Sequence, residues 1–152
     1  IRETRRIVGD YVVTREDFIN RRTFEDEICR NCYYIDVHHQ IDEAKEVVAG
    51  EKTWHDVVSK TEVRYQKGES HGVPYRALLP RGLINVIVAG RSVSSDHIVN
   101  GSLRVMPVCL AMGEAAGMAA AMATDAGDDF RQVDVQALRG KLRTAGAYLP
   151  DK

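Results

Sequence analysis

The feature of the sequence that most limits its possible folds is an almost continuous apolar run at residues 83–89, which ends at Gly90. A run of this kind is typical of a β-strand that is covered on both faces, as in the parallel sheets of α/β proteins. Residues 91–103 are polar and predict an irregular loop, and Pro107 then stands where a new helix would begin. Strong helix formers follow as far as Thr124. The sequence therefore predicts an α/β fold built around a strand, a loop and a long helix.

Shorter stretches of β-branched and aromatic residues predict further strands. These stretches lie at residues 7–13, 33–38 and 75–79. A polar excursion covers residues 40–72, and we expect it to contain amphipathic helices near 42–49 and 53–59, a strand at about 61–66 and a turn at 67–72.

Capping patterns predict the shorter helices. Residues 14–17, with Thr first and Asp last, form a capping box before a short helix. Residues 24–30 are expected to form a second short helix. A final helix is predicted at 135–144, with Asp134 as its N-cap and Gly146 just after its end.

The composition is that of an ordinary globular domain, since 44% of the 152 residues are hydrophobic and 28% are charged. With 21 Lys+Arg against 22 Asp+Glu, the formal net charge is −1, and we expect no nucleic-acid partner. The chain starts at Ile1 instead of Met, so we expect a piece of a longer gene product, or a chain that follows a trimmed leader. Its three cysteines are too few for a disulfide scaffold, which favours a reducing, cytoplasmic setting.

Residues 105–123 have to be weighed as a membrane span, because they are 19 residues long and carry a single charge, Glu114. They are rich in alanine, with Gly113 and Gly117 one turn apart, and a charged side chain at the centre of a bilayer is costly. Small residues instead let a helix lie close against a sheet or a ligand. We therefore predict the buried helix of a globular domain and no membrane span.

Several catalytic and nucleotide-binding motifs are missing from the sequence. No two of the 12 glycines are spaced two residues apart, so the dinucleotide-binding pattern G-x-G-x-x-G does not occur. The Gly140-Lys141 pair lacks the earlier glycine of a P-loop. Gly90 to Ser94 comes close to the nucleophile elbow of a hydrolase, but serine replaces the final glycine. A serine hydrolase is therefore not predicted.

Cys29 and Cys32 form a C-x-x-C pair that invites a redox or a metal interpretation. The acidic residues 25–27 precede the pair and would raise a thiol pKa, which disfavours redox catalysis. A zinc site could recruit His38 or His39, but a second closely spaced ligand pair is missing. We interpret both residues as ordinary thiols and predict no metal site, with a zinc-dependent module as the weaker alternative.

The start of the long helix is the best candidate for a ligand site. In open α/β sheets, ligands bind beyond the carboxyl ends of strands, where loops lead into helix N-termini. The helix that begins near Met106 and Pro107 would offer unpaired N–H groups and a partial positive charge, which suit a phosphate or a developing anion. Gly101 and Ser102 stand just before it and add room and a hydroxyl group. A plain strand–loop–helix connection explains the same residues.

Three long blocks of the sequence closely resemble the C-terminal part of bacterial FAD-dependent oxidoreductases, a family distantly related to fumarate-reductase-type flavoproteins. These blocks are residues 79–94, 97–107 and 112–117, and the shorter segments 3–9, 34–38 and 73–76 are similar to the same family. The resemblance implies an α/β fold, or α+β for a fragment. That fold would combine the C-terminal piece of a Rossmann-like FAD/NAD(P)-binding domain with part of a substrate-side β-rich region.

The resemblance also divides the chain and assigns cofactor contacts. Residues 79–152 would complete the FAD-binding domain, and residues 1–78 would belong to the substrate-side region. Gly90 and Arg91 would lie near the ribityl or phosphate groups of FAD, where an arginine pairs with phosphate but accepts no hydrogen bond. The helix N-terminus at 106–107 would face the pyrimidine edge of the flavin ring, where its dipole favours negative charge.

The resemblance implies His97 and Arg104 as catalytic candidates. Arg104 would hold a carboxylate or carbonyl of the substrate, and His97 would move a proton beside hydride transfer. The alternatives are a His97 that orders its loop as a hydrogen-bond donor, and an Arg104 that pairs with one of the many acids of the chain. Tyr75 and Arg76 either line the same cleft or simply pack.

Two functions from different classes follow. The resemblance implies the C-terminal fragment of an enzyme that transfers hydride between an organic small-molecule substrate and FAD, inactive alone because it lacks the pyrophosphate loop. The alternative is a non-catalytic binding or oligomerisation module. In either case we expect the isolated chain to self-associate, because the apolar strand and the Ala/Met-rich helix would expose apolar surface.

Overall fold

The computed structural model of the protein describes residues 5–36 and 64–150, which have an α+β fold. The α-helices are α1 (Arg15–Ile19), α4 (His97–Leu103), α5 (Met106–Ala123) and α6 (Val135–Thr144). The strands are β1 (Glu27–Asn31) and β2 (His71–Pro74). Short 3-10 helices are η1 (Tyr75–Leu78), η2 (Gly90–Ser92), η3 (Thr124–Ala126) and η4 (Phe130–Gln132).

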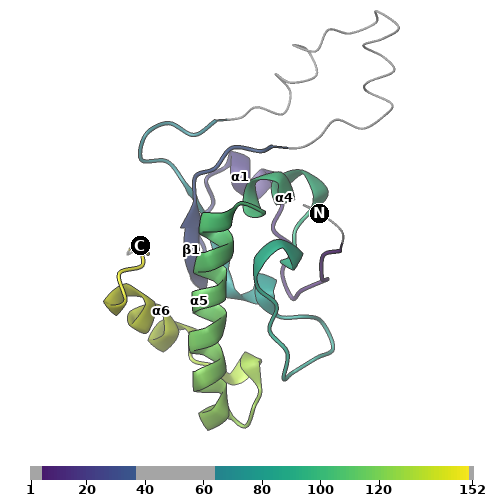
Figure 1. Cartoon of the computed structure of the whole chain (residues 1–152), viewed down its shortest axis with the longest axis vertical. Helices are drawn as coiled ribbons and strands as arrows, with labels where there is room; N and C mark the ends of the chain where they lie inside the picture. The colour runs from purple at the N-terminus through teal and green to yellow at the C-terminus, as the bar shows by residue number, and fades with distance from the viewer. Residues whose placement is uncertain (1–4, 37–63, 151–152) are drawn as a thin grey trace, which may run out of the picture.

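The longest element, α5, runs through the middle of the molecule, with β1 alongside it and α6 beside its lower half (Figure 1). The buried side of α5 consists of Val108, Met112 and four alanines. Because alanine side chains are short, this side of the helix lies close to the strand that it covers. The core is completed by side chains from both ends of the chain, among them Phe18, Ile28 and Leu138.

The two strands pair in an antiparallel sheet. Arg30 lies opposite Gly72 and Asn31 lies opposite His71, while the register shifts between Glu27 and Cys29. Cβ atoms alternate between the two faces of a strand, so this register determines which side chains of the two strands lie on the face that α5 covers.

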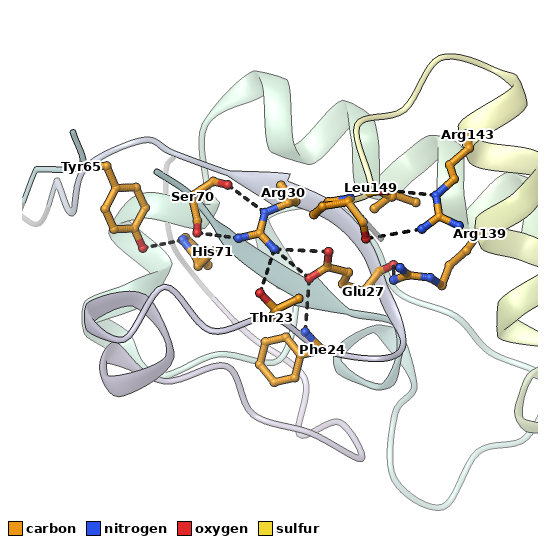
Figure 2. A network of polar contacts seen from close by, with 11 residues as sticks. Thr23, Phe24, Glu27, Arg30, Tyr65, Ser70, His71, Arg139, Arg143 and Leu149 are labelled. Atoms are coloured by element: carbon orange, nitrogen blue, oxygen red, sulfur yellow. Dashed lines mark hydrogen bonds and ion pairs between the residues drawn. The ribbon is translucent and has the colours of Figure 1, made fainter. Parts of the chain in front are cut away.

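A buried polar network holds this sheet to its surroundings (Figure 2). The Arg30 guanidinium lies 3.0 Å from a carboxylate oxygen of Glu27, and Arg30 also donates to the hydroxyl and the carbonyl of Ser70. Arg139 of α6 donates to the backbone carbonyl of Glu27 at 2.7 Å. The network thus joins β1 to α6 and to the residue that precedes β2.

The two helices predicted from an N-cap residue, after Thr14 and after Asp134, are confirmed. Thr14 caps α1 in a capping box with Asp17, and Asp134 caps α6 by accepting from two backbone N–H groups. Gly146 follows α6 with φ +102, a left-handed conformation that glycine adopts without strain. The long helix begins at Met106, one residue earlier than Pro107, and ends beside Thr124 as expected.

The strand predicted at residues 83–89 is wrong. These residues have no regular secondary structure, and the side chains of Leu83 and Ile84 are 48% and 57% exposed. Their backbone hydrogen bonds to other segments are isolated and form no ladder. The N–H of Val88 donates to the carbonyl of Leu78, and the carbonyl of Ile84 accepts from the N–H of Phe130. A strand needs a neighbour with which to form a ladder, and the sheet of the described residues contains only β1 and β2.

Other predicted elements are also corrected. Residues 24–30 do not form a helix, because residues from 27 onward belong to β1, where β2 supplies the hydrogen bonds. Residues 7–13 make only the isolated bridges at Gly9 and Val13, and residues 33–36 form no strand. The predicted strand at 75–79 is instead the 3-10 helix η1.

The polar excursion is described only in part. The amphipathic helices expected near 42–49 and 53–59 lie outside the described residues, as does the start of the strand expected at 61–66, while residues 64–66 form no strand. A turn is present at 67–68, but residues 71–72 of the expected turn belong to β2.

Within the described residues, one helical stretch, Met106–Ala126, is long and apolar enough to cross a membrane by length and composition alone. A core helix passes the same test. Only 28% of the most apolar part of this stretch is buried, although it contacts β1, α6, η2 and η4. The helix therefore has one covered side and one open side.

Candidate functional site

The N-terminus of α5 is open to solvent. Val105 is its N-cap residue and makes no side-chain capping bond, and Met106 and Pro107 at its first positions are exposed. The first turn of a helix carries N–H groups without an intrahelical partner and the positive end of the helix dipole. This end of α5 therefore has the electrostatic character of an anion site.

Gly90 and Arg91 lie beside this helix end. Both belong to η2, which contacts α5, and Arg91 Nε donates to the carbonyl oxygen of Arg104 at 3.1 Å. Gly90 has φ +79, and a Cβ atom at this position would meet no other atom within 4 Å. Of the six predicted cofactor-binding residues, the structure thus brings together the pair at 90–91 and the pair at 106–107.

The predicted loop at 91–103 is wrong in its second half, which forms α4. Asp96 caps this helix by accepting from Val99 N–H at 2.7 Å, and its other oxygen accepts from Arg15 N–H at 2.6 Å. An aspartate before a short run of helix-compatible residues is a recognisable N-cap signal, so the sequence contained a sign of α4. His97 is the first residue of α4 and is exposed.

Gly101 and Ser102 lie inside α4 and are buried. The Ser102 hydroxyl donates to the carbonyl of Tyr33 at 2.6 Å and accepts from the side-chain amide of Asn31 at 2.7 Å. A hydroxyl has one proton to donate, and this one is already used inside the protein. Ser102 therefore ties α4 to the end of β1 and does not offer its hydroxyl at the surface, contrary to the sequence-based expectation of an accessible hydroxyl.

Arg104 is buried between α4 and α5. Its guanidinium donates to the backbone carbonyl of Asp36 at 2.5 Å and lies 3.9 Å from the carboxylate of the same residue. Pairing with an acid was the alternative to a substrate contact, and Asp36 is that acid. Arg104 thus anchors the chain at residue 36 next to the start of α5.

A cavity of about 320 Å³ opens beside the N-terminus of α5. Its lining is mainly aromatic and apolar and consists of Asn31, Cys32, Tyr33, Tyr34, Arg64, Tyr65, Val105 and Pro107. The rings of Tyr33 and Tyr34 stack with centroids 4.5 Å apart, and the Arg64 guanidinium lies 4.9 Å from the centre of the Tyr34 ring. Flat walls of this kind suit a planar organic ligand.

Two of the tyrosines that line the cavity, Tyr33 and Tyr65, have a raised pKa. The hydrogen bond with Tyr34 is the main cause that raises the pKa of Tyr33, and burial raises the pKa of Tyr65. The Tyr65 hydroxyl donates to the Phe18 carbonyl at 2.6 Å. It also lies 2.8 Å from His71 Nδ1, as Figure 2 shows. Tyr65 is therefore held by its hydroxyl group, while its ring lines the cavity.

Sequence reasoning missed these aromatic walls. The Tyr33-Tyr34 pair and Tyr65 come from segments that are far apart in the sequence, and each segment was interpreted as part of a strand. The only local signal was that Tyr33 and Tyr34 are adjacent in the sequence.

The two cysteines of the C-x-x-C pair, Cys29 and Cys32, lie in different environments. Cys29 is buried in β1, and burial raises the pKa of its thiol to about 12, with the charge of Glu27 acting in the same direction. Cys32 is exposed at the rim of the aromatic cavity. Both are free thiols, and no group of three or more metal-ligating side chains occurs in the described part of the chain.

Comparison with known proteins identifies the family of the chain. The model of the FAD dependent oxidoreductase family matches residues 1–142, and the chain belongs to that family. No curated protein and no solved structure matches the chain. The family is FAD-dependent, so the cofactor is FAD, and a flavin-linked redox function follows.

Proposed function

We propose that this chain completes the FAD-binding domain of an enzyme that transfers hydride between a small organic substrate and FAD. The observation that carries the proposal is the solvent-open N-terminus of α5 with Gly90 and Arg91 beside it. The open space at Gly90 and the exposed guanidinium of Arg91 leave room for a large anionic ligand. These residues fit FAD, whose flavin ring supplies the hydride-accepting chemistry when it is bound.

The chain's own groups have distinct proposed roles. The first turn of α5 at 106–107 stabilises negative charge on a bound ring system through its N–H groups and dipole. Arg91 pairs with a phosphate. Exposed His97 moves a proton, and the tyrosine-lined cavity excludes water around the substrate. Arg104, held by Asp36, positions the start of α5 and brings a positive charge to it.

The 152 residues do not bind FAD tightly alone in this proposal. No G-x-G-x-x-G occurs in them, so the pyrophosphate loop comes from another polypeptide segment. That segment covers the open side of α5 and the exposed residues Leu83 and Ile84.

The test is the absorbance of the purified full-length protein in the flavin band. We expect a yellow protein, and an Arg91→Gln variant that retains at least tenfold less FAD after dialysis. Arg81→Gln is the matched control, because Arg81 is also exposed but belongs to the turn after Pro80, outside both η2 and α5. A colourless protein that ignores added FAD would overturn the proposal and favour the non-catalytic module.

A further inference from the structure

A second cavity, of about 560 Å³, lies between residues 22–26, η1 and the start of α6. It shares no lining residue with the aromatic cavity at α5, and its volume is in the range of small-molecule sites. Tyr75 and Arg76, expected either to line the cleft of His97 and Arg104 or simply to pack, both line this separate cavity.

The apolar part of this cavity is formed by Phe24, Tyr75, Leu79 and Val135. The Tyr75 hydroxyl donates to the Phe130 carbonyl at 2.9 Å, so the polar end of this side chain is already satisfied. Phe24, Tyr75 and Leu79 are themselves buried, so they form a fixed apolar floor, and a ring or a branched aliphatic group that lies on it is partly removed from water.

The charged part of the cavity is balanced. Three cations and three anions line it, namely Arg22, Arg76, Arg131, Asp10, Glu25 and Asp26. Arg76 Nε lies 2.9 Å from Asp26, and Arg131 Nε lies 3.0 Å from Asp10. Each pair presents a positive and a negative group side by side next to the apolar surface.

We propose that this cavity binds a small zwitterion with an apolar body, such as an α-amino acid with an aromatic side chain. The ligand carboxylate lies against the guanidinium of Arg76 and the ligand ammonium against the carboxylate of Asp26, which forms a ring of alternating charges. A simple anion meets the carboxylate of the same pair as well as the guanidinium, so attraction and repulsion largely cancel. A simple cation is attracted by the carboxylate of the pair and repelled by its guanidinium, so these two effects also largely cancel.

The test is a calorimetric titration of the 152-residue chain with L-phenylalanine. We expect saturable binding of L-phenylalanine. Phenylacetate lacks the ammonium, phenethylamine lacks the carboxylate and glycine lacks the apolar body, and we expect each of them to bind at least tenfold more weakly. Absence of saturable binding, or phenylacetate binding as tightly as phenylalanine, would overturn the proposal.

Variants locate the site. Arg76→Gln and Asp26→Asn should each weaken binding at least tenfold, and Arg81→Gln, outside the cavity, should leave it unchanged. Arg131 is left intact because it also donates to the carbonyls of Pro80 and Leu83. Circular dichroism checks the fold of each variant, and if one of the two variants unfolds, the other alone decides the outcome.

An equal loss of binding in Arg81→Gln would place the binding site elsewhere. Flavin is not needed, so the result is independent of the proposed oxidoreductase function.

Discussion

The carboxylate of Glu27 and the guanidinium of Arg30 form an ion pair 3.0 Å long that is almost closed to water, with side chains 0% and 9% exposed. Glu27 also accepts from the backbone N–H of Phe24, and Arg30 holds Ser70. The pair therefore lies where the 23–26 loop, both strands and α6 meet. Each charge of a buried ion pair is stabilised by the other, because removal of either one leaves an uncompensated charge in the interior of the protein.

Replacing one member of this pair should strongly destabilise the fold. Glu27→Gln leaves the Arg30 charge without its partner, and we expect a loss of about 3 to 5 kcal/mol in the free energy of unfolding, measured by urea denaturation. Glu69→Gln is the matched control, since the side chains of the Glu69–Arg21 pair are 34% and 36% exposed and the pair should contribute far less. Similar losses in the two variants would contradict this account.

Gly72 should not tolerate alanine. A Cβ atom there would lie 2.1 Å from a carboxylate oxygen of Glu27, which Arg30 holds in place. We expect Gly72→Ala to cost about 1 to 3 kcal/mol of stability, as overpacking does elsewhere. In Gly113→Ala, where the new methyl group meets nothing within 4 Å and the residue is helical, a gain of up to about 1 kcal/mol is expected. Thermal unfolding of both variants decides the matter, and a neutral Gly72→Ala would refute the clash.

Stability should decline in mild acid because of His71. Burial lowers the pKa of this side chain to about 4, and the charge of Arg30 acts in the same direction while that of Asp17 opposes it. The folded protein holds the neutral ring, and the unfolded chain protonates near its ordinary pKa of about 6.5. Stability is therefore complete above that pH and falls by up to about 3 kcal/mol as the pH drops to about 4.

The measurement is the free energy of unfolding in urea as a function of pH. In His71→Gln the contribution of residue 71 to the slope of the unfolding free energy against pH, between about pH 6.5 and 5, should disappear. The reason is that a glutamine side chain binds no proton in this range, in either the folded or the unfolded chain. An unchanged slope in the variant would assign the acid sensitivity to other groups.

The isolated chain should self-associate through the open side of α5. Met106 and Leu110 are 70% and 73% exposed there, next to the exposed Gly113 and Gly117. We expect light scattering to detect dimers or larger species, and Leu110→Glu to return the chain toward the monomer mass. Ala137→Glu, at an exposed position of α6, is the control. A monomeric wild-type chain at high concentration would refute the expectation.

The candidate site was predictable in part. The order of elements and the family resemblance together grouped Gly90, Arg91 and the start of α5, and the structure places η2 against α5. The residues between them were misjudged, because Ser102 is turned inward to Asn31 and Tyr33, which are about seventy residues away in the sequence. No local pattern reports a partner at that distance.

By itself, the sequence determined where α1 begins, where α5 and α6 begin and end, and that the chain resembles a flavin-dependent family. Helix caps and helix propensities act between residues a few positions apart, so Thr14 with Asp17, or Asp134 with its own first turn, carry their meaning locally. Only the tertiary structure decided that residues 27–31 form a strand and that 83–89 stay irregular and partly exposed. Strand formation and burial depend on which segments lie alongside, and that neighbourhood is a property of the folded chain as a whole.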